Sequence, residues 1–309
     1  MSNLRSPSRP ERRAARFVPQ LEALEDRNCP SFIGVHGHTL LIIGDPTADT
    51  VSVTDSGNGT VTGTIDGQSA TGTTINHVVV HTRGGDDTLT YTLTNPLTSP
   101  LHLQIDMGAG NDTATLDFSP GVSSSRLKID FNGGKGDDTL TTMFGDITSS
   151  RVNFRADLGQ GTDTFDSTLL GNVIGDSAVR FLVNGSTGDD TIGVHAANTN
   201  IDANARVDLD LLGGKGNDAI NVDYQGVLNG KLRLNANGGP GDDTINANLT
   251  LNAGSTGELR GRVRGGPGND TLTFNVVDNS GGTADVDASV SGGPGADTII
   301  STPNVKQRS

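Results

Sequence analysis

The sequence lacks several residue types on which common kinds of function depend. It has 309 residues with one cysteine, no tryptophan, two tyrosines and six histidines. Because a single cysteine cannot pair within the chain, Cys29 excludes an internal disulfide framework. The scarcity of histidine and cysteine disfavours a site for soft metal ions. The scarcity of tyrosine and tryptophan argues against an enzyme that holds a polysaccharide on aromatic side chains.

Long apolar runs and catalytic motifs are also missing. No run of about twenty apolar residues occurs, so the sequence predicts no membrane-spanning segment. The N-terminus lacks the apolar core, about 7 to 15 residues long, of an ordinary secretory signal. We find no nucleophile elbow, and the glycine-rich stretches lack the Lys-Ser/Thr ending of a phosphate loop. The chain is therefore predicted not to be an enzyme.

Positive charge is scarce beyond the N-terminus. Residues 1–27 hold six arginines and four acidic residues, whereas the remaining chain holds 16 basic and 32 acidic residues. Aspartate outnumbers glutamate by 32 to 4, which favours short carboxylates in tight turns over a merely solvated surface. We expect this body to have no basic face, which makes nucleic acid a poor partner and hard cations the natural counterpart.

What the chain does contain is a repeated nonapeptide, of which GGKGDDTLT at residues 133–141 is the clearest copy. Nine copies align on an aspartate at intervals of 25 to 28 residues: Asp87, Asp112, Asp138, Asp163, Asp190, Asp218, Asp243, Asp270 and Asp297. A glycine stands two places before each of these aspartates. Glycine adopts positive φ at little steric cost, so each copy predicts a tight turn. The fixed period indicates a repeat architecture.

Hydrophobic residues on both sides of the turn alternate with polar ones. The residue seven places before each of the nine aspartates is apolar, as is the residue two places after it. This period of two predicts strand, glycine turn and strand in every unit. We therefore predict an all-β protein, an elongated parallel β-solenoid of about nine coils of 25 to 28 residues with an N-terminal cap. The alternative is an antiparallel meander in which each glycine turn closes a hairpin.

Composition divides the chain into four parts. Residues 1–31 are predicted to be a disordered or targeting leader because they are rich in arginine, proline and serine. Residues 32–75 are expected to form the β cap, with a degenerate copy of the repeat at Asp49. Residues 76–301 are predicted to be the solenoid, and residues 302–309 a C-terminal tail.

The aspartates in the turns are candidate metal ligands. Calcium prefers six to eight carboxylate and carbonyl oxygens in flexible geometry, which aspartate in a glycine turn can supply. The simpler reading is that each aspartate only caps its own turn through a hydrogen bond. Asparagine would cap a turn about as well, yet all nine positions hold aspartate while the preceding position varies among Asp, Asn, Thr and Ala. This contrast favours a calcium ligand.

The nonapeptide resembles G-G-x-G-x-D-x-U-x, with U apolar, the repeat of the RTX or haemolysin-type calcium-binding proteins. The resemblance implies a parallel β-roll in which Ca²⁺ lies between glycine loops of successive coils, held by the nine aligned aspartates and by loop carbonyls. The glycines so assigned are Gly133, Gly136, Gly213, Gly216, Gly238, Gly241, Gly265, Gly268, Gly292 and Gly295. RTX proteins have loops on both sides of an eighteen-residue turn, whereas here one loop occurs per unit, so the metal ladder should run along one edge. The loops that end at Asp87, Asp112, Asp163 and Asp190 depart most from the pattern.

A second resemblance concerns export. Residues 21–31, LEALEDRNCPS, are similar to an N-terminal signature, LE-x-LEDR-x-x-PS, of predicted surface and exported repeat proteins of planctomycete bacteria. It implies an extracellular or cell-surface protein, whose partners would be calcium ions and cell-surface or extracellular-matrix components. Two alternatives remain open: a purely structural solenoid with an adhesive or ice-binding face of outward threonines, or a β-helix enzyme acting on polysaccharide. Asp166, Asn221 and Asn246 interrupt the threonine rows.

Overall fold

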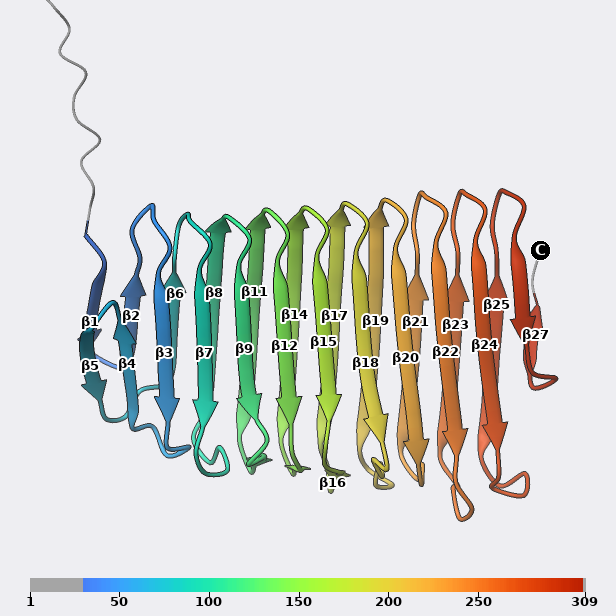
Figure 1. The fold of residues 1–309 in the computed structure, drawn as a ribbon. Helices are drawn as coiled ribbons and strands as arrows, with labels where there is room; N and C mark the ends of the chain where they lie inside the picture. The colour runs from blue at the N-terminus through green and yellow to red at the C-terminus, as the bar shows by residue number, and fades with distance from the viewer. Residues whose placement is uncertain (1–29, 308–309) are drawn as a thin grey trace, which may run out of the picture.

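The chain forms a flattened solenoid with two long sheets facing each other (Figure 1). The computed structural model describes residues 30–307. The predicted leader and the end of the predicted tail lie largely outside these residues. No helix occurs between residues 30 and 307, and this part of the chain contains no helix long and apolar enough to cross a membrane.

Twelve strands form each large sheet and three short strands form a small one. Sheet A contains β1 (Phe32–His36), β2 (Thr39–Ile43), β6 (His77–His81), β8 (Leu101–Ala109), β11 (Arg126–Lys135), β14 (Arg151–Gln160), β17 (Ala178–Thr187), β19 (Arg206–Lys215), β21 (Lys231–Asn237), β23 (Glu258–Arg264), β25 (Asp285–Ser291) and β27 (Val305–Gln307). Sheet B contains β5 (Gln68–Gly72), β4 (Val61–Ile65), β3 (Thr50–Asp55), β7 (Thr88–Leu93), β9 (Thr113–Phe118), β12 (Thr139–Phe144), β15 (Thr164–Leu169), β18 (Thr191–Ala197), β20 (Ala219–Gly226), β22 (Thr244–Leu251), β24 (Thr271–Asp278) and β26 (Thr298–Ser301). The small sheet contains β10 (Val122–Ser123), β13 (Ile147–Thr148) and β16 (Val173–Ile174).

Strands of successive units lie side by side and run in the same direction. In sheet A, Leu127 of β11 pairs with Val152 of β14, one unit later, and sheet B repeats this relationship. The predicted parallel β-solenoid is therefore confirmed. The alternative meander is wrong, because among the described strands antiparallel pairing is confined to β1 with β2 and to β3, β4 and β5.

The core is a thin layer between the two sheets, built from the alternate apolar residues. Six phenylalanines and Tyr91 lie among the largest fully buried side chains. Several form a stack along the axis, in which the rings of Tyr91 and Phe118 lie 5.0 Å apart and those of Phe118 and Phe144 lie 5.4 Å apart. Each coil thus contributes few large side chains, which explains how a chain with 4% aromatic residues fills its core.

The N-terminal end is covered as the sequence predicts for a cap. β2 and β3 already pair in parallel with β6 and β7, so the degenerate copy at Asp49 forms a coil of its own. β1 adds to the edge of sheet A, and β4 and β5 add to the edge of sheet B. These antiparallel additions occupy strand edges that would otherwise be unpaired.

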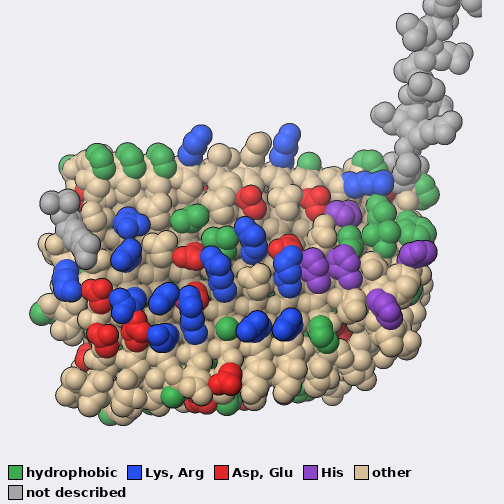
Figure 2. All heavy atoms as spheres, turned by 180° about the vertical axis from the view of Figure 1, so that it is seen from behind, with side chains coloured by type: hydrophobic (Ala, Val, Ile, Leu, Met, Phe, Trp, Pro, Cys, Tyr) green, Lys and Arg blue, Asp and Glu red, His purple; other side chains and the backbone are tan. Residues whose placement is uncertain are grey.

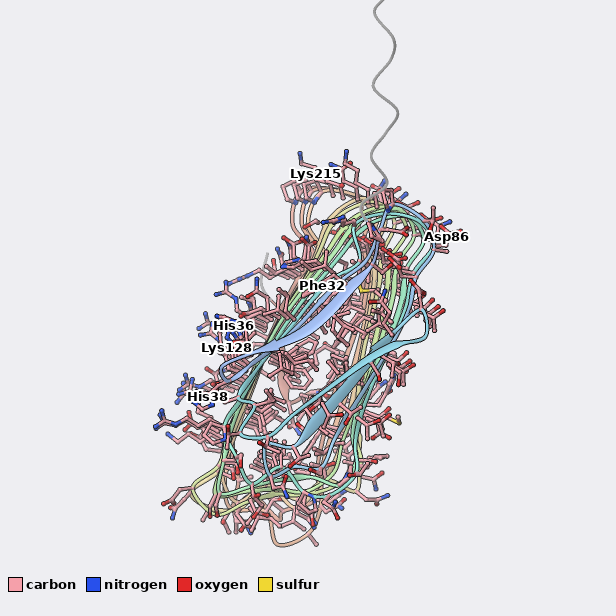
Figure 3. The ribbon with its side chains drawn as sticks, turned by 90° about the vertical axis from the view of Figure 1, so that its left-hand side faces the viewer. Phe32, His36, His38, Asp86, Lys128 and Lys215 are labelled. Atoms are coloured by element: carbon pink, nitrogen blue, oxygen red, sulfur yellow. The ribbon has the colours of Figure 1, made fainter. Side chains whose placement is uncertain are left out.

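Charge is distributed unevenly around the solenoid. Fourteen of the 16 basic residues that follow residue 27 lie on strands of sheet A, and the strands of sheet B carry no lysine or arginine. Figure 2 shows these basic side chains gathered on the outer side of sheet A. The expectation of a body without a basic face is therefore wrong, because alternate outward positions of successive strands bring scattered residues together. Seen along the axis, Asp86, in the turn of the first of the nine units, projects from one edge, whereas Lys128 lies on the sheet A side (Figure 3).

Candidate functional site

The glycine turns join sheet A to sheet B along one edge of the solenoid. Because successive turns stack closely on one another, they require glycine at fixed positions. The glycine two places before each aligned aspartate has φ between +100° and +152°, a region that side chains disfavour. An ideal Cβ on Gly241 would lie within 3.0 Å of the carbonyl oxygen of Gly216, one coil earlier, a separation that real Cβ atoms do not show. Glycine is required here because coils stack at the spacing of neighbouring strands, about 4.8 Å.

All nine predicted aspartates form one continuous hydrogen-bonded ladder, which we call the inner ladder. In each coil Oδ1 accepts the backbone N–H of the aligned aspartate one coil earlier, at 2.7 to 3.1 Å. Asp49 of the degenerate copy is the first donor, to Asp87. The four departing loops join the ladder like the others. The aspartates therefore link coils, and the hypothesis that each caps only its own turn is wrong.

The second oxygen of these carboxylates has no partner. In eight of the aligned aspartates Oδ2 is buried and accepts no hydrogen bond: Asp87, Asp112, Asp138, Asp163, Asp190, Asp218, Asp243 and Asp270. Their side chains are at most 2% exposed. A buried carboxylate oxygen without a partner is costly, so each of these atoms needs one, such as a proton, a water molecule or a cation.

Burial accordingly favours the protonated form of these groups. Desolvation raises the pKa of Asp138 and Asp190 to about 7, although hydrogen bonds from the backbone act in the opposite direction. Neighbouring aspartates of the ladder raise the pKa values further. For the same main reason the pKa of Asp112 and of Asp243 rises to about 6. The ladder is thus poised to hold a proton or to exchange it for a metal ion.

The first glycine of the nonapeptide lies against this free oxygen. An ideal Cβ on Gly185 would lie within 3.0 Å of Oδ2 of Asp190 and also of the carbonyl oxygen of Gly213 in the next coil. The same arrangement recurs at Gly213, beside Asp218 and the carbonyl of Gly238. A carboxylate oxygen and a carbonyl oxygen of adjacent coils therefore approach one position from two sides.

Some of the carbonyl groups predicted as calcium ligands already accept hydrogen bonds from backbone N–H groups. The carbonyls of Gly238, Gly265 and Gly292 accept N–H groups of the preceding coil at 2.8 to 2.9 Å. A carbonyl oxygen has two lone pairs and can take a second partner. Among residues 30–307 no cluster of three or more His, Cys, Asp or Glu side chains could hold a metal ion. A cation here would therefore depend on one or two carboxylates together with carbonyls.

An outer ladder, which the sequence reasoning missed, runs beside the inner one. In seven of the nine units, the residue before the aligned aspartate accepts a backbone N–H of the following coil, opposite in direction to the inner ladder. Seven such bonds, at 2.7 to 3.0 Å, are accepted by Asp86, Asn111, Asp137, Asp189, Asn217, Asp242 and Asn269. The frequent occurrence of Asp and Asn at this position of the repeat could have predicted the outer ladder from the sequence.

Comparison of the chain with models of protein families, with curated proteins and with solved structures finds no match. The proposed function therefore rests on the arrangement of the two ladders.

Proposed function

We propose that the protein is a calcium-stabilised β-solenoid with a structural role outside the cytoplasm, and that it has no catalytic activity. The difference between the two ladders carries this proposal. In the outer ladder, where the side chain only has to accept a hydrogen bond, Asp and Asn both occur. In the inner ladder Oδ1 makes the same kind of bond, yet every member is Asp. The charge on the free Oδ2 is what distinguishes the two positions.

The residues fit calcium better than other ions. Beside Gly133, Gly185 and Gly213, the Oδ2 atoms of Asp138, Asp190 and Asp218 lie near a carbonyl oxygen of the next coil. Calcium takes both kinds of oxygen at about 2.3 to 2.6 Å in variable geometry. Residues that would hold it are the nine aspartates of the inner ladder and the carbonyls of the first glycines. The bound ion would supply positive charge to a row of carboxylates that otherwise repel one another. This role agrees with the resemblance to RTX repeats.

The proposed location follows from the expected affinity. Sites with one or two carboxylates bind calcium in the millimolar range, which is typical of extracellular modules and above cytosolic levels. The resemblance of residues 21–31 to a signature of exported proteins supports the same location.

A second candidate is a purely structural ladder in which Oδ2 is protonated and donates to the carbonyl of the next coil. The raised pKa values of Asp138 and Asp190 favour it. Melting curves at pH 7.5 with chelator, with about 5 mM Ca²⁺ and with about 5 mM Mg²⁺ separate the two candidates. We expect calcium alone to raise the melting temperature. Identical curves in all three solutions would leave the protonated ladder as the better account.

A further inference from the structure

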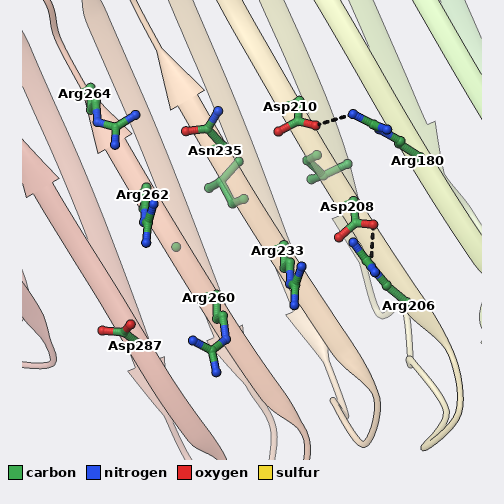
Figure 4. A pocket seen from close by; sticks show the side chains of 13 residues that line it. Arg180, Arg206, Asp208, Asp210, Arg233, Asn235, Arg260, Arg262, Arg264 and Asp287 are labelled. Carbon is green, nitrogen blue, oxygen red and sulfur yellow. Dashed lines mark hydrogen bonds and ion pairs between the residues drawn. The ribbon is translucent and has the colours of Figure 1, made fainter.

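The outer side of sheet A bears a groove whose walls are arginine side chains. Six arginines line it from four neighbouring strands, β17, β19, β21 and β23: Arg180, Arg206, Arg233, Arg260, Arg262 and Arg264. The groove has a volume of about 620 Å³ and crosses the strands along the solenoid axis (Figure 4). It lies on the face of sheet A, away from the interior position that the free Oδ2 atoms occupy.

Half of these arginines are available to a ligand. Arg180 pairs with Asp210 and Arg206 with Asp208, at 3.2 and 2.5 Å, and Arg260 pairs with Glu258. Arg233, Arg262 and Arg264 are exposed and form no ion pair with any residue of the described chain. Three uncompensated guanidinium groups on two adjacent strands are unusual in a protein of net charge −14, and they mark this groove as a site for an anion.

The other side chains in the groove restrict the class of anion that it can bind. Asp208, Asp210 and Asn235 stand between the arginines, and Asp287 of the neighbouring strand lies beside Arg260. A dense row of phosphates would meet these carboxylates and be repelled, whereas sugar hydroxyls can donate to them. The groove strands also present no aromatic side chain outward, since their one aromatic residue, Phe181, is fully buried. Single-stranded nucleic acid is usually held by stacking on aromatic rings, which this face cannot offer.

We propose that this groove binds a linear acidic polysaccharide whose carboxylates pair with Arg233, Arg262 and Arg264. The planar guanidinium fork matches a carboxylate in two parallel hydrogen bonds. Arg233 of β21 lies one strand spacing, about 4.8 Å, along the axis from β23, and Arg262 and Arg264 lie two residues apart on β23. The three charges therefore form a compact cluster that adjacent sugar units of one chain can reach. Asp208, Asp210 and Asn235 would bind hydroxyl groups between those carboxylates.

The test measures binding of the full chain to polygalacturonate, with dextran as a neutral polymer and with single-stranded and duplex DNA as competing polyanions. Chelator is present throughout, so that calcium held by the polysaccharide or by the inner ladder plays no part. We expect binding to polygalacturonate that weakens as salt rises, and no binding to dextran. The triple variant Arg233→Gln/Arg262→Gln/Arg264→Gln should bind at least about tenfold more weakly.

Two further variants make the result specific. Arg83→Gln/Lys135→Gln/Lys215→Gln removes the same charge from exposed positions outside the groove and should bind like the wild type. Changing the three groove arginines to lysine keeps the charge but removes the fork, and should give an intermediate affinity. Melting curves confirm that each variant is folded.

Three outcomes would overturn the proposal. The first is equal binding of polygalacturonate by wild type and the Gln variant. The second is tighter binding of either DNA than of polygalacturonate. The third is wild-type self-association, seen by light scattering, that the Gln variant loses, because the groove would then hold the acidic edge of a second copy.

Discussion

Oδ1 of Asp243 accepts the backbone N–H of Asp218, one coil earlier, at 2.8 Å, while Oδ2 of the same carboxylate has no hydrogen-bond partner. One side chain therefore both joins two coils and buries an unsatisfied negative atom. The first role explains why an acceptor recurs every 25 to 28 residues, and the second is the reason to look for a cation.

The stacked glycines should be intolerant of any side chain. We predict that Gly241→Ala lowers the free energy of unfolding by about 3 kcal/mol or more, because it adds a positive-φ penalty and a clash with the carbonyl of Gly216. Gly254→Ala is the control, since Gly254 also has positive φ but nothing within 4 Å of an added Cβ. It should cost about 1 kcal/mol. Equal losses in urea denaturation would contradict the close stacking of the turns.

Each member of the outer ladder should contribute one hydrogen bond to the free energy of unfolding, and its charge should have little effect on stability. We predict that Asn217→Ala costs about 1 kcal/mol, because the N–H of Asp242 loses its acceptor at 2.8 Å. Asn217→Asp should be within about 0.5 kcal/mol of the wild type, because it retains an acceptor oxygen at an exposed site. Thermal or urea unfolding measures both. A large loss in the Asp variant would show that this position is not a simple acceptor.

The inner ladder should make stability depend on pH when calcium is absent. The pKa values of Asp138 and Asp190 are raised to about 7 by burial, so the folded chain binds more protons than the unfolded chain between about pH 4 and 7. Their contribution is complete below about pH 4 and is lost as pH rises to about 7, on the order of a few kcal/mol in total. Unfolding in chelator across this range measures it. Stability that increases with pH would refute the raised pKa values.

The aromatic stack should hold neighbouring coils together. Phe181 is fully buried, with its ring 5.1 Å from that of Phe154 and 5.5 Å from that of Phe144. We predict that Phe181→Ala costs about 3 to 5 kcal/mol, because it leaves a cavity between three coils. Phe32→Ala is the control, since Phe32 is 51% exposed, and it should change stability by less than about 1 kcal/mol. A small effect at Phe181 would mean that the core collapses around the missing ring.

The architecture was predictable from sequence because spacing and alternation both repeat. The line of nine aspartates followed from their alignment, and Asp49 was recognised despite its missing glycines. The direction of the hydrogen bonds was not predictable, since an aspartate can bond to its own turn or to the next coil and only the stacking decides. The basic groove was missed because its arginines come from four separate units. Aligning the units on outward positions, ten places before Asp190, Asp243 and Asp270, would have placed Arg180, Arg233 and Arg260 in one row.

The most direct test of the calcium proposal compares two neighbouring charges. Asp243→Asn removes the charge of an inner-ladder member, and Asp242→Asn removes an equal charge from the outer ladder, where asparagine occurs naturally. Melting temperatures are measured with chelator and with about 5 mM Ca²⁺. We predict that the calcium-induced rise is smaller for Asp243→Asn than for the wild type and unchanged for Asp242→Asn, because only the inner carboxylate holds the ion. An identical rise in all three proteins would contradict a ligand role for Asp243, and no rise in any of them would contradict calcium binding by the ladder.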